Sequence, residues 1–264
     1  MLSTEDLTHS QHGLRSVSSE FKVSLCITCK GRLHQIKETL PINIEANRSF
    51  AGIEFVLLDY SSPDGLSEWV KTAIPNEITS GRVAYYKIDN QKHFRHAHAK
   101  NVAHRLACAP IVCNLDADNF SGVGFAEFLH NTFTHSSGVF LHSHGVPGAY
   151  GRLAFMKADF ELLGGYDEDL RYGWGYEDND LKLRAKAFGL HPIVLRPSSQ
   201  FLCFLEHSDV ERTAFAPLRQ KMRSRRLNQR ISKLHLFNGV LTANLGRKWG
   251  SAVVRKNFGE IIEL

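Results

Sequence analysis

Two aspartates close an apolar run in the first half of the chain, in the sequence Leu115-Asp116-Ala117-Asp118. Alternate residues of a strand point to the same side, so we expect both carboxylates to face one site. Two convergent carboxylates repel each other unless a cation lies between them, and their hard oxygens suit Mn²⁺ or Mg²⁺. A divalent ion there would neutralise a diphosphate and stabilise it as a leaving group. The pattern alone is common at strand ends and gains weight from its context.

A second group of chemically active residues is the run Gly173-Trp174-Gly175-Tyr176-Glu177-Asp178-Asn179-Asp180. Carboxylates at the start of a helix complement the helix dipole, but this explanation leaves the glycines and the tryptophan unexplained. The glycines give a loop that a ligand can approach closely, and an exposed Trp174 offers a face for a sugar ring. A carboxylate behind that ring could accept a proton from a hydroxyl group. We therefore interpret this run as functional.

A histidine follows an apolar run further along, in Glu206-His207-Ser208-Asp209. The chain has 14 histidines, and a single one is usually a polar surface residue. His207 becomes a candidate as a further ligand of the ion held by Asp118, because imidazole, carboxylate and phosphate oxygens together suit Mn²⁺.

The elements that must position these residues alternate between strands and helices in the first half of the chain. Strands are predicted at residues 23–28, 53–60, 82–88 and 109–118, and helices at 32–47, 66–73 and 94–107. This alternation predicts a mostly parallel sheet with helices on both faces. Ligands of such sheets bind beyond the carboxyl ends of the strands. Thr28, Lys30, Arg32, Asp59, Ser61 and Asp116 lie at or after these ends and should therefore share one edge.

The second half of the chain is less regular. Strands are predicted at 150–156, 192–195 and 201–205, and helices at 158–163 and 177–188. We expect a loose leader over residues 1–20 and a catalytic domain over 21–210. Within that domain, 21–120 would be the nucleotide-binding half and 121–210 the acceptor half. Residues 211–264 would form a basic helical extension.

Composition points to a folded protein. The chain has 264 residues, of which 43% are hydrophobic and 22% charged, so a disordered or fibrous protein is excluded. No run reaches membrane-spanning length, and the first residues lack a signal-peptide pattern. The five cysteines, most of them in apolar runs, are typical of reduced thiols. We expect a cytoplasmic protein.

Much of the net charge of +5 lies between residues 212 and 233. Apolar residues at steps of four and five predict an amphipathic helix with a basic face. Two interpretations remain open, a solvated face of a packing helix and peripheral contact with the inner face of a membrane. Nucleic-acid binding is disfavoured because the basic run lacks interleaved aromatic residues.

Taken in order, these motifs resemble a known enzyme family. The series is the basic residues after the first strand, then F-x-x-A-x-x-x-N-V from Phe94, then D-x-D, then G-W-G-x-E-D-x-D, then His207-Ser208-Asp209. It is similar to the inverting galactosyltransferases that build β-linked lactosamine-type bonds. The run Gly164-Gly165-Tyr166-Asp167-Glu168-Asp169 is also similar to bacterial family-two enzymes of the chondroitin- and hyaluronan-polymerase type and to polypeptide N-acetylgalactosaminyltransferases. The resemblance spans about residues 22–210.

This resemblance implies an α/β GT-A fold, in which a mostly parallel mixed sheet is flanked by helices, and a UDP-sugar donor with Mn²⁺ or Mg²⁺. Asp118 and His207 would bind the metal with support from Asp116, and Asp178 would be the general base. Trp174, Gly175, Tyr176, Glu177 and Gly151 would contact the acceptor and the sugars. The nucleotide would contact Thr28, Lys30, Arg32, Asp59, Ser61, Phe94, His96, Asn101, Asp116 and Ala117. The acceptor would be a saccharide or a lipid-linked saccharide.

The chain also departs from the galactosyltransferase pattern. His96 stands where the family has arginine, and Phe204 replaces a methionine that contacts the metal there. Gly148, nine residues before Lys157, replaces an aromatic residue that excludes N-acetylated donors, which predicts that UDP-N-acetylhexosamine is accepted. A two-residue shift would put Tyr150 there and reverse this prediction. The alternatives are retaining transfer on the same fold, a sugar-1-phosphate nucleotidyltransferase, and a saccharide-binding protein with a decayed site.

Overall fold

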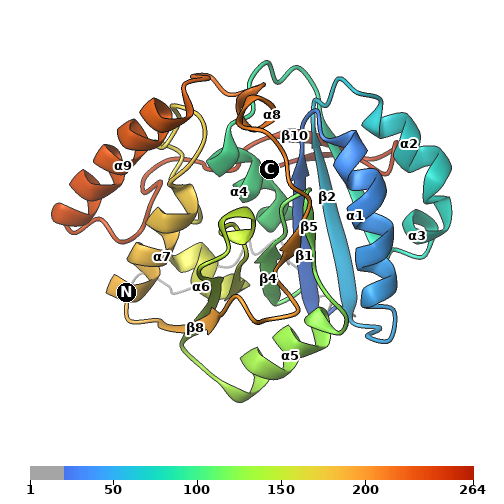
Figure 1. Cartoon of the computed structure of the whole chain (residues 1–264), viewed down its shortest axis with the longest axis horizontal. Helices are drawn as coiled ribbons and strands as arrows, with labels where there is room; N and C mark the ends of the chain where they lie inside the picture. The colour runs from blue at the N-terminus through green and yellow to red at the C-terminus, as the bar shows by residue number, and fades with distance from the viewer. Residues whose placement is uncertain (1–20) are drawn as a thin grey trace, which may run out of the picture.

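The computed structural model describes residues 21–264, and the leader predicted for residues 1–20 lies outside the described residues. A nine-stranded mixed sheet runs through the molecule, with helices on both faces (Figure 1). Its strand order is β11-β10-β3-β2-β1-β4-β7-β6-β8. The strands are β1 (Val23–Cys29), β2 (Ile53–Tyr60), β3 (Val83–Ile88), β4 (Ile111–Asn114), β5 (Asn119–Phe120), β6 (Val139–Ser143), β7 (Leu153–Met156), β8 (His191–Leu195), β9 (Cys203–Phe204), β10 (Val253–Lys256) and β11 (Ile261–Glu263). The helices are α1 (Leu33–Ala46), α2 (Leu66–Ala73), α3 (Pro75–Thr79), α4 (His96–Leu106), α5 (Phe125–His135), the 3₁₀ turn η1 (Pro147–Ala149), α6 (Lys157–Leu162), α7 (Glu177–Ala187), α8 (Asp209–Thr213) and α9 (Lys221–Phe237).

The centre of the sheet consists of the predicted βα units. Strands β3, β2, β1 and β4 are neighbours and run parallel, so their carboxyl ends meet at one edge. Every residue of β1 and β2 is buried, as expected for strands that are covered on both faces. The predicted α/β class with a sheet flanked by helices is therefore confirmed.

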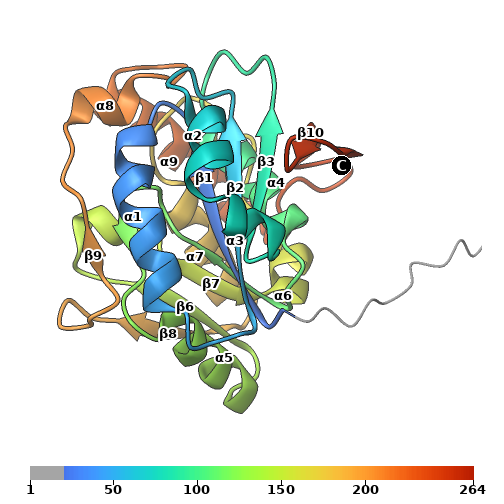
Figure 2. The same ribbon diagram turned by 90° about the vertical axis from the view of Figure 1, so that its right-hand side faces the viewer.

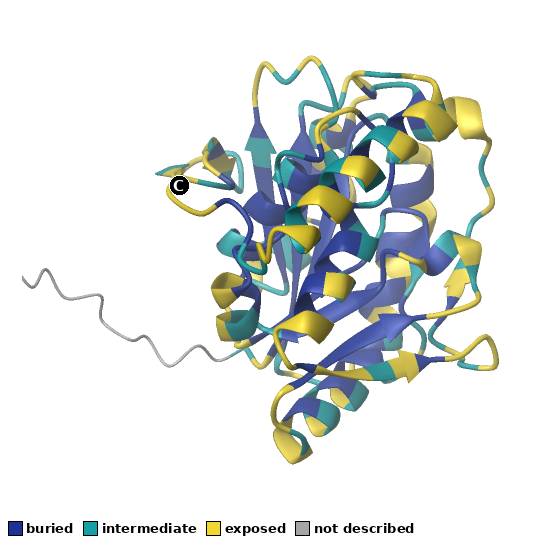
Figure 3. Cartoon of the chain, turned by 90° about the vertical axis from the view of Figure 1, so that its left-hand side faces the viewer, coloured by how far each residue is buried: buried dark blue, intermediate teal, exposed yellow. Residues whose placement is uncertain are grey.

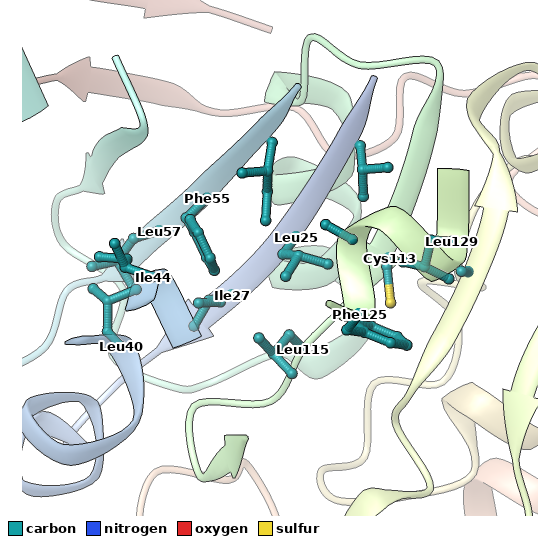
Figure 4. Close-up of a cluster of buried hydrophobic side chains, with 14 of the residues drawn as sticks. Leu25, Ile27, Leu40, Ile44, Phe55, Leu57, Cys113, Leu115, Phe125 and Leu129 are labelled. Atoms are coloured by element: carbon teal, nitrogen blue, oxygen red, sulfur yellow. The ribbon is translucent and has the colours of Figure 1, made fainter. Parts of the chain in front are cut away.

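Two apolar clusters, one on each face, hold the sheet between its helices. Alternate residues of β1 enter different clusters, Leu25 and Ile27 one of them and Cys26 the other. The first cluster packs under α1, α2 and α5 and includes Leu40 and Phe125 (Figure 4). The second packs under α4, α6 and α7. Figures 1 and 2 show α1 and α2 on one side of the sheet and α4 on the other.

Three local features differ from the sequence predictions. β4 ends at Asn114, so Asp116 and Asp118 lie in the turn after the strand and not within it. The helix α5 and the strand β6 were not predicted. β9 does not join the main sheet but pairs with β5 in a separate two-stranded sheet.

The C-terminal region contains the predicted basic helix, α9, and also two strands. β10 pairs antiparallel with β3, and β11 pairs with β10, so residues 253–263 extend the same sheet. Across residues 21–264, no helix combines the length and the apolar character that crossing a membrane would require.

Candidate active site

A cavity of about 270 Å³ opens beyond the carboxyl ends of the parallel strands. Six segments far apart in the sequence line it. They contribute Thr28, Lys30, Arg32 and Gln35; Phe94, His96 and Lys100; Asp116, Ala117 and Asp118; Pro147, Gly148, Tyr150 and Gly151; Trp174, Glu177 and Asp178; and His207, Glu211, Arg212, Phe215, Ala216 and Lys221. The fold thus brings the three groups of candidate residues into one cavity.

Asp118 and His207 are in contact with each other at the wall of this cavity. Asp118 Oδ2 lies 2.6 Å from His207 Nε2, and both side chains are largely buried. The small sheet explains the approach, because Asn119 pairs with Phe204 and the Leu205 amide donates to the Asp118 carbonyl (2.8 Å). Asn119 Nδ2 also donates to Asp118 Oδ1 (2.8 Å), which fixes the carboxylate.

This pair fits a divalent metal. Its ligand atoms are one imidazole nitrogen and one carboxylate oxygen, a set that suits Mn²⁺. Neighbouring ligands of an octahedral ion lie roughly 3 Å apart when each bond is about 2.1 Å long. To hold an ion, the two atoms would separate by a few tenths of an ångström, and Arg212 Nη2, which lies 3.3 Å from His207 Nε2, would move away from that nitrogen.

Asp116 is positioned from two sides. Asn114 Nδ2 donates to Asp116 Oδ1 (2.9 Å) and to the Gly151 carbonyl (2.9 Å). A Cβ atom at Gly151 would overlap Asp116 Oδ2, so this position requires glycine for the loop to pass over the carboxylate. The structure therefore explains Gly151 by its contact with Asp116.

Asp178 lies at the start of α7, in contact with a buried lysine. Lys100 Nζ donates to Asp178 Oδ1 (2.7 Å) and to Glu177 Oε1 (3.1 Å). Burial, with repulsion from Glu177 and Asp116, raises the pKa of Asp178 to about 7, although Lys100 opposes the shift. A group with a pKa near neutrality is suited to general-base catalysis.

Glu177 and Lys100 remain charged in this contact. Burial alone would raise the pKa of Glu177, but Lys100 and His96 outweigh it and lower that pKa. Burial would likewise lower the pKa of Lys100, but Asp178 and Glu177 raise it well above its usual value.

Two buried polar atoms at the cavity have no hydrogen-bond partner among the described residues. They are Glu177 Oε2 and His96 Nδ1. Burial lowers the pKa of His96, although Glu177 opposes the shift. Buried polar atoms are normally paired, and such exceptions at a cavity are available to a ligand.

Trp174 is held between the cavity and the C-terminal region. Arg212 and Lys221 lie over its ring, at 5.5 Å and 4.7 Å from the centroid. From α9, Ser224 Oγ donates to the Trp174 carbonyl (3.0 Å) and Asn228 Nδ2 to the Gly175 carbonyl (2.8 Å). The predicted sugar-stacking face is therefore shared with two cations.

Several residues predicted to contact the nucleotide instead form hydrogen bonds within the protein, which corrects those predictions. Lys30 borders the cavity, but its ammonium donates to the carbonyls of Tyr60 (3.2 Å), Ser61 (2.7 Å) and Gln91 (2.7 Å) and so has no proton left for a diphosphate. Ser61 Oγ donates to the Ile88 carbonyl (2.7 Å).

Asp59 and Asn101 are also structural. The buried Asp59 accepts from the Ser62 amide (2.6 Å) and from the Tyr85 hydroxyl (2.7 Å), so both oxygens are paired inside the protein. Asn101 Nδ2 donates to the Tyr166 carbonyl (2.9 Å) and to Glu168 Oε1 (2.9 Å). Neither residue lines the cavity.

Three further predictions concern the sugars, Gly175 and Tyr176 on the acceptor side and Gly148 on the donor side. Gly175 and Tyr176 are not among the cavity-lining residues, and the Tyr176 ring lies under Arg225. Gly148 does line the cavity, but a Cβ there would overlap the Phe204 ring. Phe204 therefore fills the space that the missing side chain was expected to leave.

Sequence reasoning missed Lys100, Arg212, Phe215 and Lys221. Lys100 had only a weak signal, because residues 96–106 also contain three histidines, an asparagine and an arginine, and nothing local distinguishes this lysine. The other three had none, since the fold of the C-terminal region brings them to the cavity.

Asp167, Asp169 and His235 form a second group with metal-binding side chains, away from the cavity. His235 Nδ1 lies 2.7 Å from Asp167 Oδ2, and Arg247 Nη1 lies 2.8 Å from Asp169 Oδ1. Arg247 pairs with both carboxylates, and the group lies outside the cavity that holds the other candidate residues, so the Asp118–His207 pair is the better metal candidate.

A family model described as the N-terminal domain of galactosyltransferase matches residues 131–212. No curated protein sequence matches the chain. Among solved structures, a mannosyltransferase from Pyrobaculum calidifontis in complex with GDP-Man and Mn²⁺ is similar, with TM-score 0.55 and 19% identity over 67% of this chain and 55% of that one. Staphylococcus aureus TarS 1–349 has TM-score 0.61 and 14% identity over 85% of this chain and 67% of that one. Its complex with UDP-GlcNAc has TM-score 0.55 and 14% identity, over 71% and 60%.

The TM-scores of 0.55 and 0.61 show a shared fold, the GT-A fold, and identities of 19% and 14% show no more than the fold. The chain spans little more than half the length of the mannosyltransferase that it matches.

Proposed function

We propose that this GT-A-fold glycosyltransferase transfers a hexose or N-acetylhexosamine from a UDP-sugar to a saccharide or lipid-linked saccharide, with inversion. One observation carries the proposal: the Asp118–His207 pair and the Asp178 carboxylate open into the same cavity. A metal-binding pair and a base with a pKa of about 7 are the two groups that such a displacement requires.

In the proposed reaction, Asp178 takes the proton of an acceptor hydroxyl. The hydroxyl oxygen forms a bond to the anomeric carbon of the donor while the bond from that carbon to the β-phosphate oxygen breaks. The electron pair leaves with UDP, and the configuration inverts in this single displacement. Glu177 Oε2, which is buried and has no partner within residues 21–264, would accept a hydrogen bond from a sugar hydroxyl.

Asp118 and His207 would hold Mn²⁺ or Mg²⁺, and Asp116 would support the ion or the nucleotide. A bound divalent ion would neutralise the diphosphate as it leaves. Since Lys30 is fully hydrogen-bonded, Arg32 is the better candidate for direct contact with the diphosphate. Arg32 Nη1 donates a hydrogen bond to Gln35 Oε1 (3.2 Å), and the guanidinium has further N–H groups at the cavity.

Four other residues predicted to contact the nucleotide line the cavity and remain candidates for that contact: Thr28, Phe94, His96 and Ala117. Phe94 would pack on the uracil ring. Trp174 and Tyr150 would border the sugars. A cytoplasmic location with peripheral contact to a membrane through residues 212–233 belongs to the same proposal.

The decisive experiment measures release of UDP from a panel of UDP-sugars with saccharide acceptors, with Mn²⁺ and with excess EDTA. Metal-dependent release that requires an acceptor supports the proposal. Release of pyrophosphate from UTP and a sugar 1-phosphate would instead support a nucleotidyltransferase. Saccharide binding without turnover of any donor would support a decayed site, and an α-linked product would indicate retaining transfer.

A further inference from the structure

The outward face of α9 combines positive charge with exposed apolar side chains. Its exposed residues are Met222, Arg223, Arg226, Arg230, Lys233, Leu234 and Phe237, here called the α9 outer face. At about 100° per residue they fall within an arc of about 120° on the helix. Ser224, Asn228 and Ser232, all fully buried, lie opposite. The helix therefore turns small polar residues inward and three of its six apolar residues to the outside, while Leu227, Ile231 and Leu236 are half-buried.

Three apolar side chains of this helix are unusually exposed. The exposed fraction is 87% for Phe237, 58% for Leu234 and 54% for Met222, and Leu245 beyond the helix is 83% exposed. Leu234 and Phe237, three positions apart, are neighbours on the helix surface, and exposed apolar side chains next to one another mark a surface that binds something. The inward polar residues have a clear role of their own, because Ser224 and Asn228 hold the Trp174 loop.

The charge of this face identifies the class of partner. The sequence of α9 contains no Asp or Glu. Within residues 21–264, none of Arg223, Arg226, Arg230 or Lys233 forms an ion pair. Basic residues interleaved with Phe, Leu and Met on one face suit the interface of an anionic lipid bilayer, where the rings and chains enter the headgroup layer.

We propose that the α9 outer face docks on an anionic membrane surface, with Phe237 and Leu234 inserted, and so presents the cavity to an acceptor carried by a lipid. The position of the α9 outer face next to the cavity supports the presentation of the cavity to a lipid-borne acceptor. Lys221, the first residue of α9, lines the cavity, and Met222 and Arg223 of the outer face follow it directly. In Figure 1, α9 forms one edge of the molecule, and Figure 3 views the molecule from that side, where exposed residues stand out on the helices.

The test is co-sedimentation of the full chain with vesicles of phosphatidylcholine alone and of phosphatidylcholine with phosphatidylglycerol. We expect binding to the anionic vesicles and partial release by salt. The variant R223Q/R226Q/R230Q should bind about 100-fold more weakly, since each basic residue near an anionic surface contributes roughly a factor of five. The variant L234S/F237S should also lose binding, and the binding that remains in it should be fully released by salt.

Two controls remove positive charge and apolar surface elsewhere on the molecule. K37Q/R48Q/K71Q makes the same change in charge on the α1 and α2 side, and V123S removes an apolar side chain that is 74% exposed. Both should bind like the wild type. Circular dichroism and thermal unfolding check that all variants fold.

The docking proposal would be overturned if the protein bound neither kind of vesicle, or bound both equally well. Tight binding to duplex DNA that R223Q/R226Q/R230Q abolishes and L234S/F237S leaves intact would reassign the face to nucleic acid. The lipid-borne acceptor rests on the proposed transferase function, whereas docking is measured without turnover. Vesicle binding by a protein that turns over no UDP-sugar would therefore reject the function and leave the docking face in place.

Discussion

Lys100 Nζ lies 2.7 Å from Asp178 Oδ1, in a contact that joins α4 to the start of α7. The lysine side chain is only 4% exposed, and its ammonium also reaches Glu177. A buried carboxylate beside another carboxylate tends to remain protonated at neutral pH. Lys100 therefore keeps Asp178 ionised often enough to act as a base.

The first prediction concerns K100M. Without the ammonium, burial and Glu177 raise the pKa of Asp178 above about 7 without opposition. A base must be deprotonated to work, so activity rises as pH rises through its pKa. We therefore expect the acidic limb of the kcat/KM profile to shift to higher pH. K100R, which restores the positive charge, should keep the limb closer to its original position.

Thermal unfolding of both Lys100 variants is the control, because removal of one partner of a buried ion pair is destabilising by about 3–5 kcal/mol. A folded K100M enzyme with an unshifted acidic limb would show that Lys100 does not act on the base.

The second prediction separates the roles of two neighbouring carboxylates. D178N removes the base but preserves its shape, so donor affinity should persist while transfer falls by about 10²–10⁴-fold. E177Q should instead weaken binding of the sugars, because Glu177 Oε2 is one of two buried atoms at the cavity that no described residue pairs. Titration of the donor measures its affinity, and initial rates measure transfer. A loss below tenfold in D178N would count against its role as the base.

The third prediction concerns the metal. D118A and H207A should each lose activity and donor affinity together, because the ion would bridge the protein and the diphosphate. Isothermal titration of Mn²⁺ into the wild type and both variants checks the ligands without turnover. D89A, which changes an exposed carboxylate outside the cavity, should behave like the wild type. Full turnover in excess EDTA would rule out a required metal.

The fourth prediction concerns the donor. We keep the expectation that UDP-N-acetylhexosamine is used, but it now depends on Tyr150 and no longer on Gly148. The structure moves the deciding contact, since Phe204 fills the space at Gly148 while Tyr150 lines the cavity and is 44% exposed. A donor panel measures the preference, and a steric clash of this kind is worth about 10–200-fold.

A strong preference for UDP-galactose or UDP-glucose would show that Tyr150 excludes the acetamido group. In that case Y150A should recover the N-acetylated donors, whereas Y172A, which changes a tyrosine outside the cavity, should not.

The sequence alone was sufficient for the βα order and for the sheet edge at which the site lies. Apolar runs and turn residues act over a few positions, so β1, β2 and β3 could be predicted close to their observed ends. Asp118, His207 and Asp178 could be chosen because their motifs are local and because strand ends of a parallel sheet share one edge.

Tertiary structure decided which of these side chains are free to act. Lys30 and Asp59 lie at the predicted edge, yet carbonyls and donors from other segments occupy them. Lys100 reaches Asp178 across 78 positions of sequence, and Lys221 and Arg212 reach Trp174 from the C-terminal region. Local pattern carries no information about such partners, because each pairing depends on how distant segments pack and on which polar groups burial forces together.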